Sequence, residues 1–154
     1  MSLISKILLP GNILCGLDAG SKERLFEAAG LLFENSQQIP RKKVLDSLAA
    51  REKLGSTGLG HGIAIPHGRI KGLREATGAF AKLTTPISFD APDGQPVGLL
   101  FILLVPVHAT DLHLEILGEL AQMFSDRRLR EQLQAGSDPA EIHRLLTDWR
   151  PCRR

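Results

Sequence analysis

One nearly continuous apolar segment, Val97–Val105, constrains the fold of this chain more than any other part of the sequence. Only Gly98 interrupts the segment, and Pro106 follows it directly. The segment is far shorter than the roughly 20 apolar residues that a membrane-spanning helix needs. A strand with apolar side chains on both faces must be covered on both faces, as in sheets that lie between layers of helices. We therefore predict a central strand that ends at Pro106.

Helical and strand patterns surround this segment. Apolar side chains recur at spacings of three and four residues, which is typical of helices with one buried face. Ser21 and Pro40 are suited to begin the first two helices, and Gly55 to end the second. The predicted helices are 22–34, 41–53, 111–125, 127–134 and 139–149. The predicted strands are 13–15 after a brief helical turn, 63–65, 77–83, one that begins at 87–89 and turns at 92–94, and 97–105. The alternation predicts a single α/β layered domain over residues 1–154.

Charge and cysteine content narrow the classes of function. A net charge of +2 gives no basic surface for nucleic acid, and we expect the basic residues from about 150 onward to be a solvated tail. Cys15 and Cys152 share no short motif, so we expect free thiols in a reducing compartment. The N-terminus lacks the pattern of a signal peptide. We expect a cytoplasmic protein that is not embedded in a membrane and has no nucleic-acid partner.

A glycine-rich stretch, residues 51–69, has the composition of a functional site. Five of the 15 glycines lie between Gly55 and Gly68, where the backbone N–H groups could face an anion. Pro66 precedes His67, and both follow the predicted strand 63–65 directly. Open α/β sheets commonly place ligands at the carboxyl ends of their strands. Imidazole is a competent nucleophile near neutral pH, so His67 is the first candidate, although a histidine packed in a turn is the alternative.

Two further residues are candidates to act with His67. His113 follows the carboxyl end of the predicted central strand and inclines toward the buried side of its helix, so two strand ends could bring both histidines to one cleft. A histidine that only packs at the edge of the core would explain the pattern equally well. Arg51 lies in the last turn of its predicted helix, where it could offset charge on a phosphoryl group or only interact with the helix dipole.

The loop offers further candidate groups. The hydroxyls of Ser56 and Thr57 could donate hydrogen bonds to a phosphate, or both residues could serve only as turn residues. Gly68 would leave the far side of the imidazole open to the phosphate. His61 and His108 suggest a rival metal site, but their spacings to His67 and His113 do not match common zinc motifs, so we expect no metal and no cofactor. We expect His143 to lie on the surface.

The motif as a whole resembles a known family. The sequence Arg51-Glu-x-Leu-Gly-Ser-Thr-Gly-x-Gly-x-Gly-Ile-Ala-Ile-Pro-His67-Gly is similar to the signature of the type-2 EIIA domains of the phosphoenolpyruvate-dependent phosphotransferase system (PTS), in the mannitol and fructose class. The resemblance extends to Pro86–Asp90, Leu99–Pro106 and His113-Leu114. Leu8–Pro10, Leu17-Asp18 and Phe26–Phe33 resemble the nitrogen-regulatory branch of that family.

This resemblance implies a fold, a role for each matching residue, and partners. The implied fold is a mixed central β-sheet flanked by helices. His67 matches the histidine that is phosphorylated on Nε2 by an HPr-like carrier, which in turn depends on an Enzyme I-type kinase. Arg51 and His113 match neighbours that steady the phosphoryl group, whereas no role transfers to His61 or Arg69. A carbonyl bonded to Nδ1–H of His67 would leave Nε2 free to attack, and we expect the structure to contain such a bond.

Three functions are compatible with these sequence features. The first is a regulatory phosphocarrier whose phosphorylation state changes which target proteins it binds. The second is a sugar-specific EIIA that passes the phosphoryl group to a fructose- or mannitol-type EIIB domain. The third is a metal-dependent hydrolase that uses the histidine cluster. The match at the amino terminus favours the first.

Overall fold

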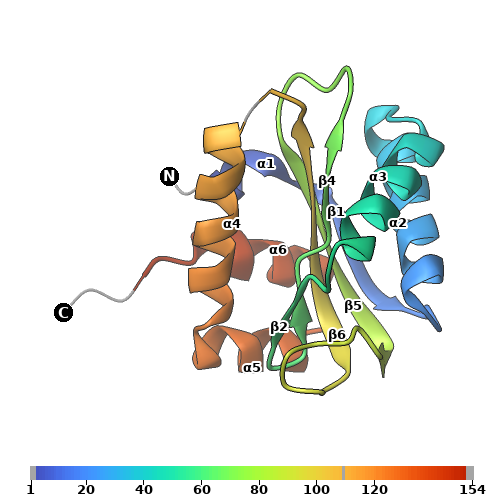
Figure 1. The fold of residues 1–154 in the computed structure, drawn as a ribbon. Coiled ribbons are helices and arrows are strands. Elements are labelled where there is room, and N and C mark those ends of the chain that lie inside the picture. The colour runs from blue at the N-terminus through green and yellow to red at the C-terminus, as the bar shows by residue number, and fades with distance from the viewer. Residues whose placement is uncertain (1–2, 109, 152–154) are drawn as a thin grey trace.

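The computed structural model describes residues 3–108 and 110–151 (Figure 1). Its strands form one mixed sheet of six strands in the order β1-β5-β6-β3-β2, with β4 also paired to β6. The strands are β1 (Leu8–Leu17), β2 (Gly58–Gly60), β3 (Ile63–Ala64), β4 (His67–Ile70), β5 (Thr77–Ile87) and β6 (Val97–Pro106). The helices are α1 (Leu3–Ile7), α2 (Lys22–Gln37), α3 (Arg41–Lys53), α4 (Thr110–Phe124), α5 (Arg127–Ala135) and α6 (Pro139–Asp148). The predicted α/β fold with a mixed sheet flanked by helices is confirmed.

The central strand is β6, as the apolar segment predicts. It pairs antiparallel with β5 and parallel with both β3 and β4. Every residue of β6 before Pro106 is buried. Side chains alternate between the two faces of a strand, so Leu99 and Phe101 contribute to one apolar cluster and Leu100 and Ile102 to the other. Full burial of one such side chain contributes roughly 1.5–3 kcal/mol.

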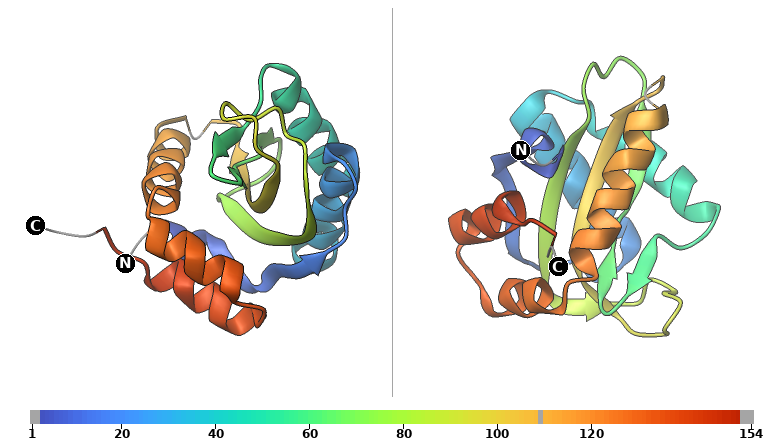
Figure 2. Two further views of the ribbon diagram at one scale, coloured as in Figure 1. Left: turned by 90° about the horizontal axis from the view of Figure 1, so that it is seen from below. Right: turned by 90° about the vertical axis from the view of Figure 1, so that its left-hand side faces the viewer.

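Helices cover both faces of the sheet (Figures 1 and 2). One apolar cluster joins the sheet to α2 and α3, and the other joins it to α1, α4, α5 and α6. The side chain of Ser21 caps α2 by accepting a hydrogen bond from the Arg24 N–H, as the sequence predicts. None of the helices in residues 3–108 and 110–151 is both long and apolar enough to cross a membrane.

Several boundaries differ from the predicted ones for physical reasons. The first strand is longer than residues 13–15, because a register shift between Leu8 and Ile13 accommodates Pro10 in a strand at the edge of the sheet. No strand begins at residues 87–89: Ile87 ends β5, and the turn closed by Gly94 N–H on the Ala91 carbonyl belongs to a loop. The short strands β2 and β4 were not predicted from the sequence.

Two other predictions concern single residues. His143 was expected on the surface, but it is half-buried, and its Nε2 lies 2.9 Å from the Leu8 carbonyl oxygen. The interaction joins α6 to β1, so this histidine has a packing role. Cys15 is a free, half-buried thiol, whereas Cys152 and the end of the basic tail lie outside the described residues.

Candidate functional site

His67 lies where three strands meet. Two residues, Ile65 and Pro66, separate β3 from β4, and His67 is the first residue of β4, opposite Leu103 of β6. The Pro66 carbonyl accepts a hydrogen bond of 2.9 Å from the Leu103 N–H. The predicted position just beyond a strand is therefore correct, and His67 also begins a strand of its own. Pairing with the central strand β6 therefore fixes the position of the His67 backbone.

The hydrogen bonds of His67 define its tautomer. The Nδ1 atom lies 2.8 Å from the Ile65 carbonyl oxygen, as the sequence led us to expect. Because a carbonyl can only accept a hydrogen bond, the proton of the neutral ring is on Nδ1. The Nε2 atom then carries a lone pair, and it accepts a hydrogen bond of 3.2 Å from Nε of Arg51. Both ring nitrogens are thus assigned, and Nε2 is the nucleophilic one.

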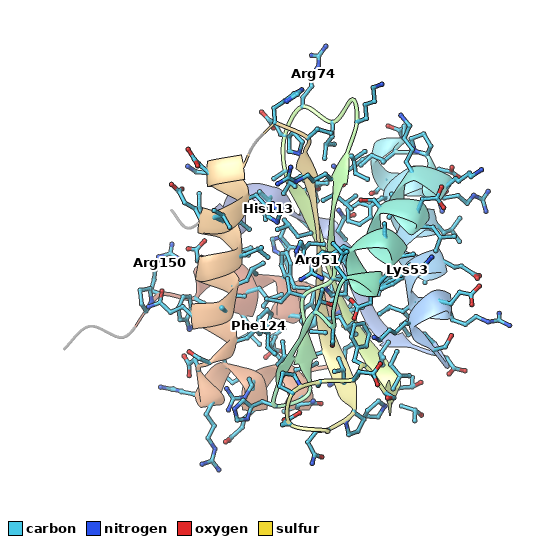
Figure 3. All side chains as sticks on the ribbon, viewed as in Figure 1. Arg51, Lys53, Arg74, His113, Phe124 and Arg150 are labelled. Atoms are coloured by element: carbon cyan, nitrogen blue, oxygen red, sulfur yellow. The ribbon has the colours of Figure 1, made fainter. Side chains whose placement is uncertain are left out.

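Arg51 and His113 both contact His67, and the two residues come from different helices (Figure 3). Arg51 lies in the last turn of α3, and its Nη1 also donates a hydrogen bond of 2.9 Å to the Gly55 carbonyl. His113 is in α4, and its ring centroid lies 5.2 Å from that of His67, with the rings inclined at 65°. Its Nε2 is buried and has no hydrogen-bond partner among the residues that the structure describes. Such a group is available to a ligand at the site.

The surroundings lower the pKa of both histidines. Burial is the main cause for His67, and the charge of Arg51 adds to it, while the bond to Ile65 and the charge of Glu52 oppose the shift. Burial is also the main cause for His113, followed by the charges of His67, Arg69 and Arg51. A lowered pKa keeps more of each imidazole uncharged at neutral pH. The site therefore favours the nucleophilic form of His67.

The hydroxyls of Ser56 and Thr57 are engaged within the protein. Ser56 Oγ donates a hydrogen bond to the Phe89 carbonyl and accepts one from Gly58 N–H. Thr57 is buried, and its hydroxyl donates a hydrogen bond of 2.7 Å to Glu52. These contacts hold the loop in place. Direct contact of either hydroxyl with a phosphate stays a prediction.

Gly68 has a packing reason in addition to the phosphate contact, which stays a prediction. A Cβ atom at this position would lie 2.1 Å from Oγ of Ser47 and 2.9 Å from its Cβ. Ser47 belongs to α3, and its hydroxyl donates a hydrogen bond of 3.0 Å to the Arg69 carbonyl. Gly68 therefore allows α3 to pack closely against β4, which is how the helix that carries Arg51 comes near His67.

Of the four histidines of the rival metal site, His67 and His113 lie in ring contact. His61 has a backbone φ of 56°, and its N–H donates a hydrogen bond to Asp93. It lines a surface pocket with residues of α5, whereas the ring that contacts His67 belongs to His113. Within residues 3–108 and 110–151, no group of three or more His, Cys, Asp or Glu side chains could hold a metal ion.

Comparison with known proteins gives the class. The family described as phosphoenolpyruvate-dependent sugar phosphotransferase system, EIIA 2, matches residues 6–149. The nitrogen regulatory protein of Pseudomonas aeruginosa is 40% identical over 149 residues, which cover 96% of this chain and 97% of that protein. The nitrogen regulatory protein of Escherichia coli is 42% identical over 129 residues, covering 83% of this chain and 79% of that protein.

A solved structure extends the similarity to the fold. The structure of nitrogen regulatory protein IIA-Ntr from Neisseria meningitidis superposes with a TM-score of 0.89 at 53% identity, covering 95% of this chain and 100% of that one. The chain belongs to the type-2 EIIA family of the phosphoenolpyruvate-dependent sugar phosphotransferase system. Within the family, it is similar over nearly its whole length to nitrogen regulatory proteins, which confirms the resemblance seen in the sequence. Membership implies a phosphocarrier that acts through a phosphohistidine.

Proposed function

We propose that this protein is a regulatory phosphocarrier that accepts a phosphoryl group on Nε2 of His67 from an HPr-like carrier. The observation that carries this proposal is the state of the imidazole. Its Nδ1–H is bonded to the Ile65 carbonyl, and its Nε2 lone pair faces the Arg51 guanidinium beside His113. A nucleophile with a cationic group next to it is the arrangement that phosphoryl transfer requires.

The reaction is one displacement at phosphorus. The Nε2 lone pair forms a bond to the phosphorus atom of the carrier's phosphohistidine, and the bond between that phosphorus and the carrier's nitrogen breaks. The bonding electron pair returns to the carrier's imidazole. The proton on Nδ1 of His67 stays in its hydrogen bond to the Ile65 carbonyl, so the step needs no external acid or base.

Arg51 and His113 act on the transferring group in this proposal. Arg51 turns its N–H donors from Nε2 to the phosphoryl oxygens as the new bond forms, while Nη1 keeps its bond to the Gly55 carbonyl. The Nε2 atom of His113 supplies a second contact in the tautomer that carries a proton there. One cation and neutral donors hold the dianion without the uniform tight binding that would slow onward transfer.

Isotope labelling tests the proposal directly. The protein is incubated with labelled phosphoenolpyruvate, Enzyme I and an HPr-type carrier. We expect acid-labile, base-stable label on the wild type and none on His67→Ala. His61→Asn is the matched control, because it removes the other histidine of the loop. We expect this variant to carry the label as the wild type does. Label that persists on His67→Ala would overturn the assignment.

A second experiment separates regulation from sugar transport. The 36% identity over 108 residues to a fructose-specific EIIA component of Haloferax volcanii is the observation that favours transport. The phosphorylated protein is offered a panel of fructose- and mannitol-type EIIB domains. For a regulatory carrier we expect slow discharge to all of them. Rapid discharge to any one would replace regulation by transport as the function.

A further inference from the structure

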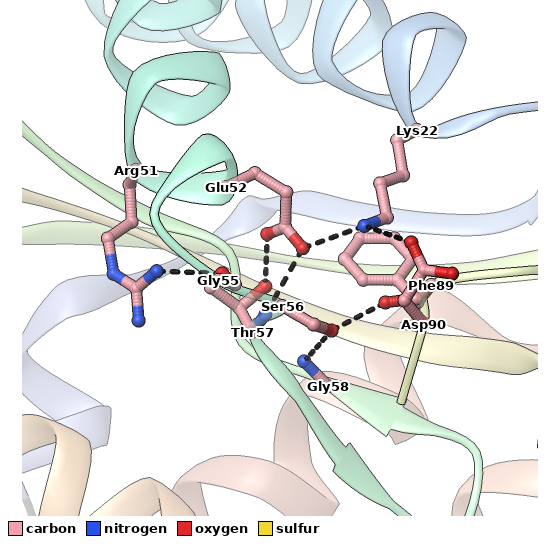
Figure 4. Close-up of polar contacts among 9 residues, drawn as sticks. All are labelled: Lys22, Arg51, Glu52, Gly55, Ser56, Thr57, Gly58, Phe89 and Asp90. Atoms are coloured by element: carbon pink, nitrogen blue, oxygen red, sulfur yellow. Dashed lines mark hydrogen bonds and ion pairs between the residues drawn. The ribbon is translucent and has the colours of Figure 1, made fainter. Parts of the chain in front are cut away.

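A polar cluster behind the site joins α2, α3 and the glycine loop (Figure 4). Its centre is Glu52, which follows Arg51 in α3. Successive residues of a helix point about 100° apart, and the side chains of Arg51 and Glu52 point in different directions (Figure 4). Arg51 donates a hydrogen bond to His67. We name Lys22, Glu52 and Thr57 the Glu52 cluster. Neither Glu52 nor Lys22 is among the site residues that the sequence predicts.

Every oxygen of the Glu52 carboxylate is bonded. Oε2 accepts hydrogen bonds of 2.9 Å from Nζ of Lys22 and 3.1 Å from the Thr57 N–H, and Oε1 accepts one of 2.7 Å from the Thr57 hydroxyl. Only 7% of the Glu52 side chain is exposed. Hydrogen bonds to a charged, shielded carboxylate are stronger than those between neutral groups. The Glu52 carboxylate therefore fixes both the backbone and the side chain of Thr57.

Lys22 extends the cluster to the opposite wall of the loop. Its Nζ lies 3.6 Å from Asp90 and 4.7 Å above the centre of the Phe89 ring. The Phe89 carbonyl in turn accepts the hydrogen bond of Ser56. Residues 55–58 are consequently fixed from two sides, by Glu52 and by the segment at residues 89–90. The carbonyl that holds the Arg51 guanidinium belongs to Gly55, at the start of this fixed loop.

We propose that Glu52, bonded to Lys22 and Thr57, is a positioning residue for phosphoryl transfer, because it fixes the loop whose Gly55 carbonyl holds Arg51 on His67. This inference rests on the proposed transfer to His67. An acidic residue in the last turn of a helix is unfavourable with respect to the helix dipole, and here Lys22 compensates for it. The cluster acts on the reaction through Arg51 and does not touch the phosphoryl group.

The first test compares maximal phosphorylation rates. We expect Glu52→Gln and Thr57→Val each to lower the rate at saturating HPr-type carrier by roughly ten- to hundredfold with little change in KM, since small misplacements of a catalytic group have effects of this size. Glu34→Gln is the matched control, because Glu34 also links α2 to α3, through two bonds to Arg41 remote from His67. We expect its rate to stay within about twofold of the wild type.

The second test follows His67 itself by NMR titration. Thr57→Val removes a hydroxyl without changing any charge, so a rise in the pKa of His67 reports that the Arg51 guanidinium has moved away, whereas a Glu52 carboxylate that moved away would lower that pKa. We expect that pKa to rise, because the charge of Arg51 lowers it in the wild type. In an Arg51→Met background, Glu52→Gln should slow transfer no further, since residues that act through one another are not additive.

The outcomes decide between distinct explanations. Unchanged rates per folded molecule in Glu52→Gln and Thr57→Val would reduce the cluster to a structural role and overturn the inference. If Thr57→Val is phosphorylated slowly while Glu52→Gln is phosphorylated at the wild-type rate, the inference is overturned in favour of direct phosphate binding by Thr57. If Glu52→Gln does not fold, Lys22→Met and Thr57→Val carry the test. If the wild type takes no label, the proposed function fails, and the His67 titration alone decides whether the cluster positions Arg51.

Discussion

Arg51 donates a hydrogen bond from Nε to the Nε2 atom of His67, over 3.2 Å. In the proposed transfer the same lone pair attacks phosphorus, so the resting protein holds the Nε2 atom on the group that would then bind the phosphoryl oxygens. The bond requires Nε2 to be unprotonated, because the guanidinium can only donate. Together with the bond between Nδ1 and Ile65, it selects the tautomer that has its lone pair on Nε2.

Replacement of Arg51 tests this relationship. We expect Arg51→Met to slow phosphorylation of His67 by about a hundredfold or more, as loss of an electrostatic stabiliser commonly does. The pKa of His67 should rise at the same time, because the charge of Arg51 lowers it. Rapid-quench labelling measures the first effect and NMR titration the second. An unchanged rate would show that Arg51 only orients the resting imidazole.

His113 gives a separate prediction. Its Nε2 is buried without a hydrogen-bond partner among the described residues, and its ring faces His67. We expect His113→Gln to slow transfer by roughly ten- to hundredfold while the circular dichroism spectrum and melting temperature stay near those of the wild type. Quench-flow labelling at saturating carrier measures the rate. A variant that unfolds but transfers normally per folded molecule would assign His113 to packing.

The histidine pair predicts a pH dependence of stability. The pKa of His67 and of His113 is lowered in the folded protein from 6.5, so below that pH the unfolded state binds more protons than the folded one. Their contribution to stability is complete above about pH 6.5 and is lost as the pH falls toward the folded pKa values. Urea unfolding across this range measures it. We expect His67→Gln to lose less stability on acidification than the wild type, and equal losses would contradict the shift.

Gly68 predicts a steric effect on stability. We expect Gly68→Ala to destabilise the protein by about 1–3 kcal/mol, because the new Cβ would meet Oγ of Ser47 at 2.1 Å. Gly118→Ala is the matched control: it lies in α4 with nothing within 4 Å of the added Cβ, and alanine should stabilise a helix interior by about 0.5–1 kcal/mol. Thermal and urea unfolding measure both. Destabilisation of equal size in the two variants would remove the packing explanation for Gly68.

The parts of the fold that could be predicted are those with a long local pattern. The β6 strand was predicted within one residue, because a nearly continuous apolar run leaves few other conformations. The helix 41–53 was predicted at both ends, because Pro40 precedes it and its apolar positions are regular. By contrast, β2 and β4 contain three and four residues. Segments this short have no period to detect, and only their pairing partners make them strands.

The sequence by itself predicted which histidine is the candidate nucleophile, because a long motif surrounds it. It also determined what kind of layered domain carries that histidine, because an apolar segment requires cover on both faces. Tertiary structure decided which groups surround that histidine. The helix that carries Arg51 precedes His67 in the sequence, and the helix that carries His113 follows it. Only the packing of both helices on one sheet brings the two side chains to the ring of His67. It also directed the Thr57 hydroxyl to Glu52, since a buried carboxylate must be fully hydrogen-bonded. That requirement depends on burial, which single residues in a sequence do not record.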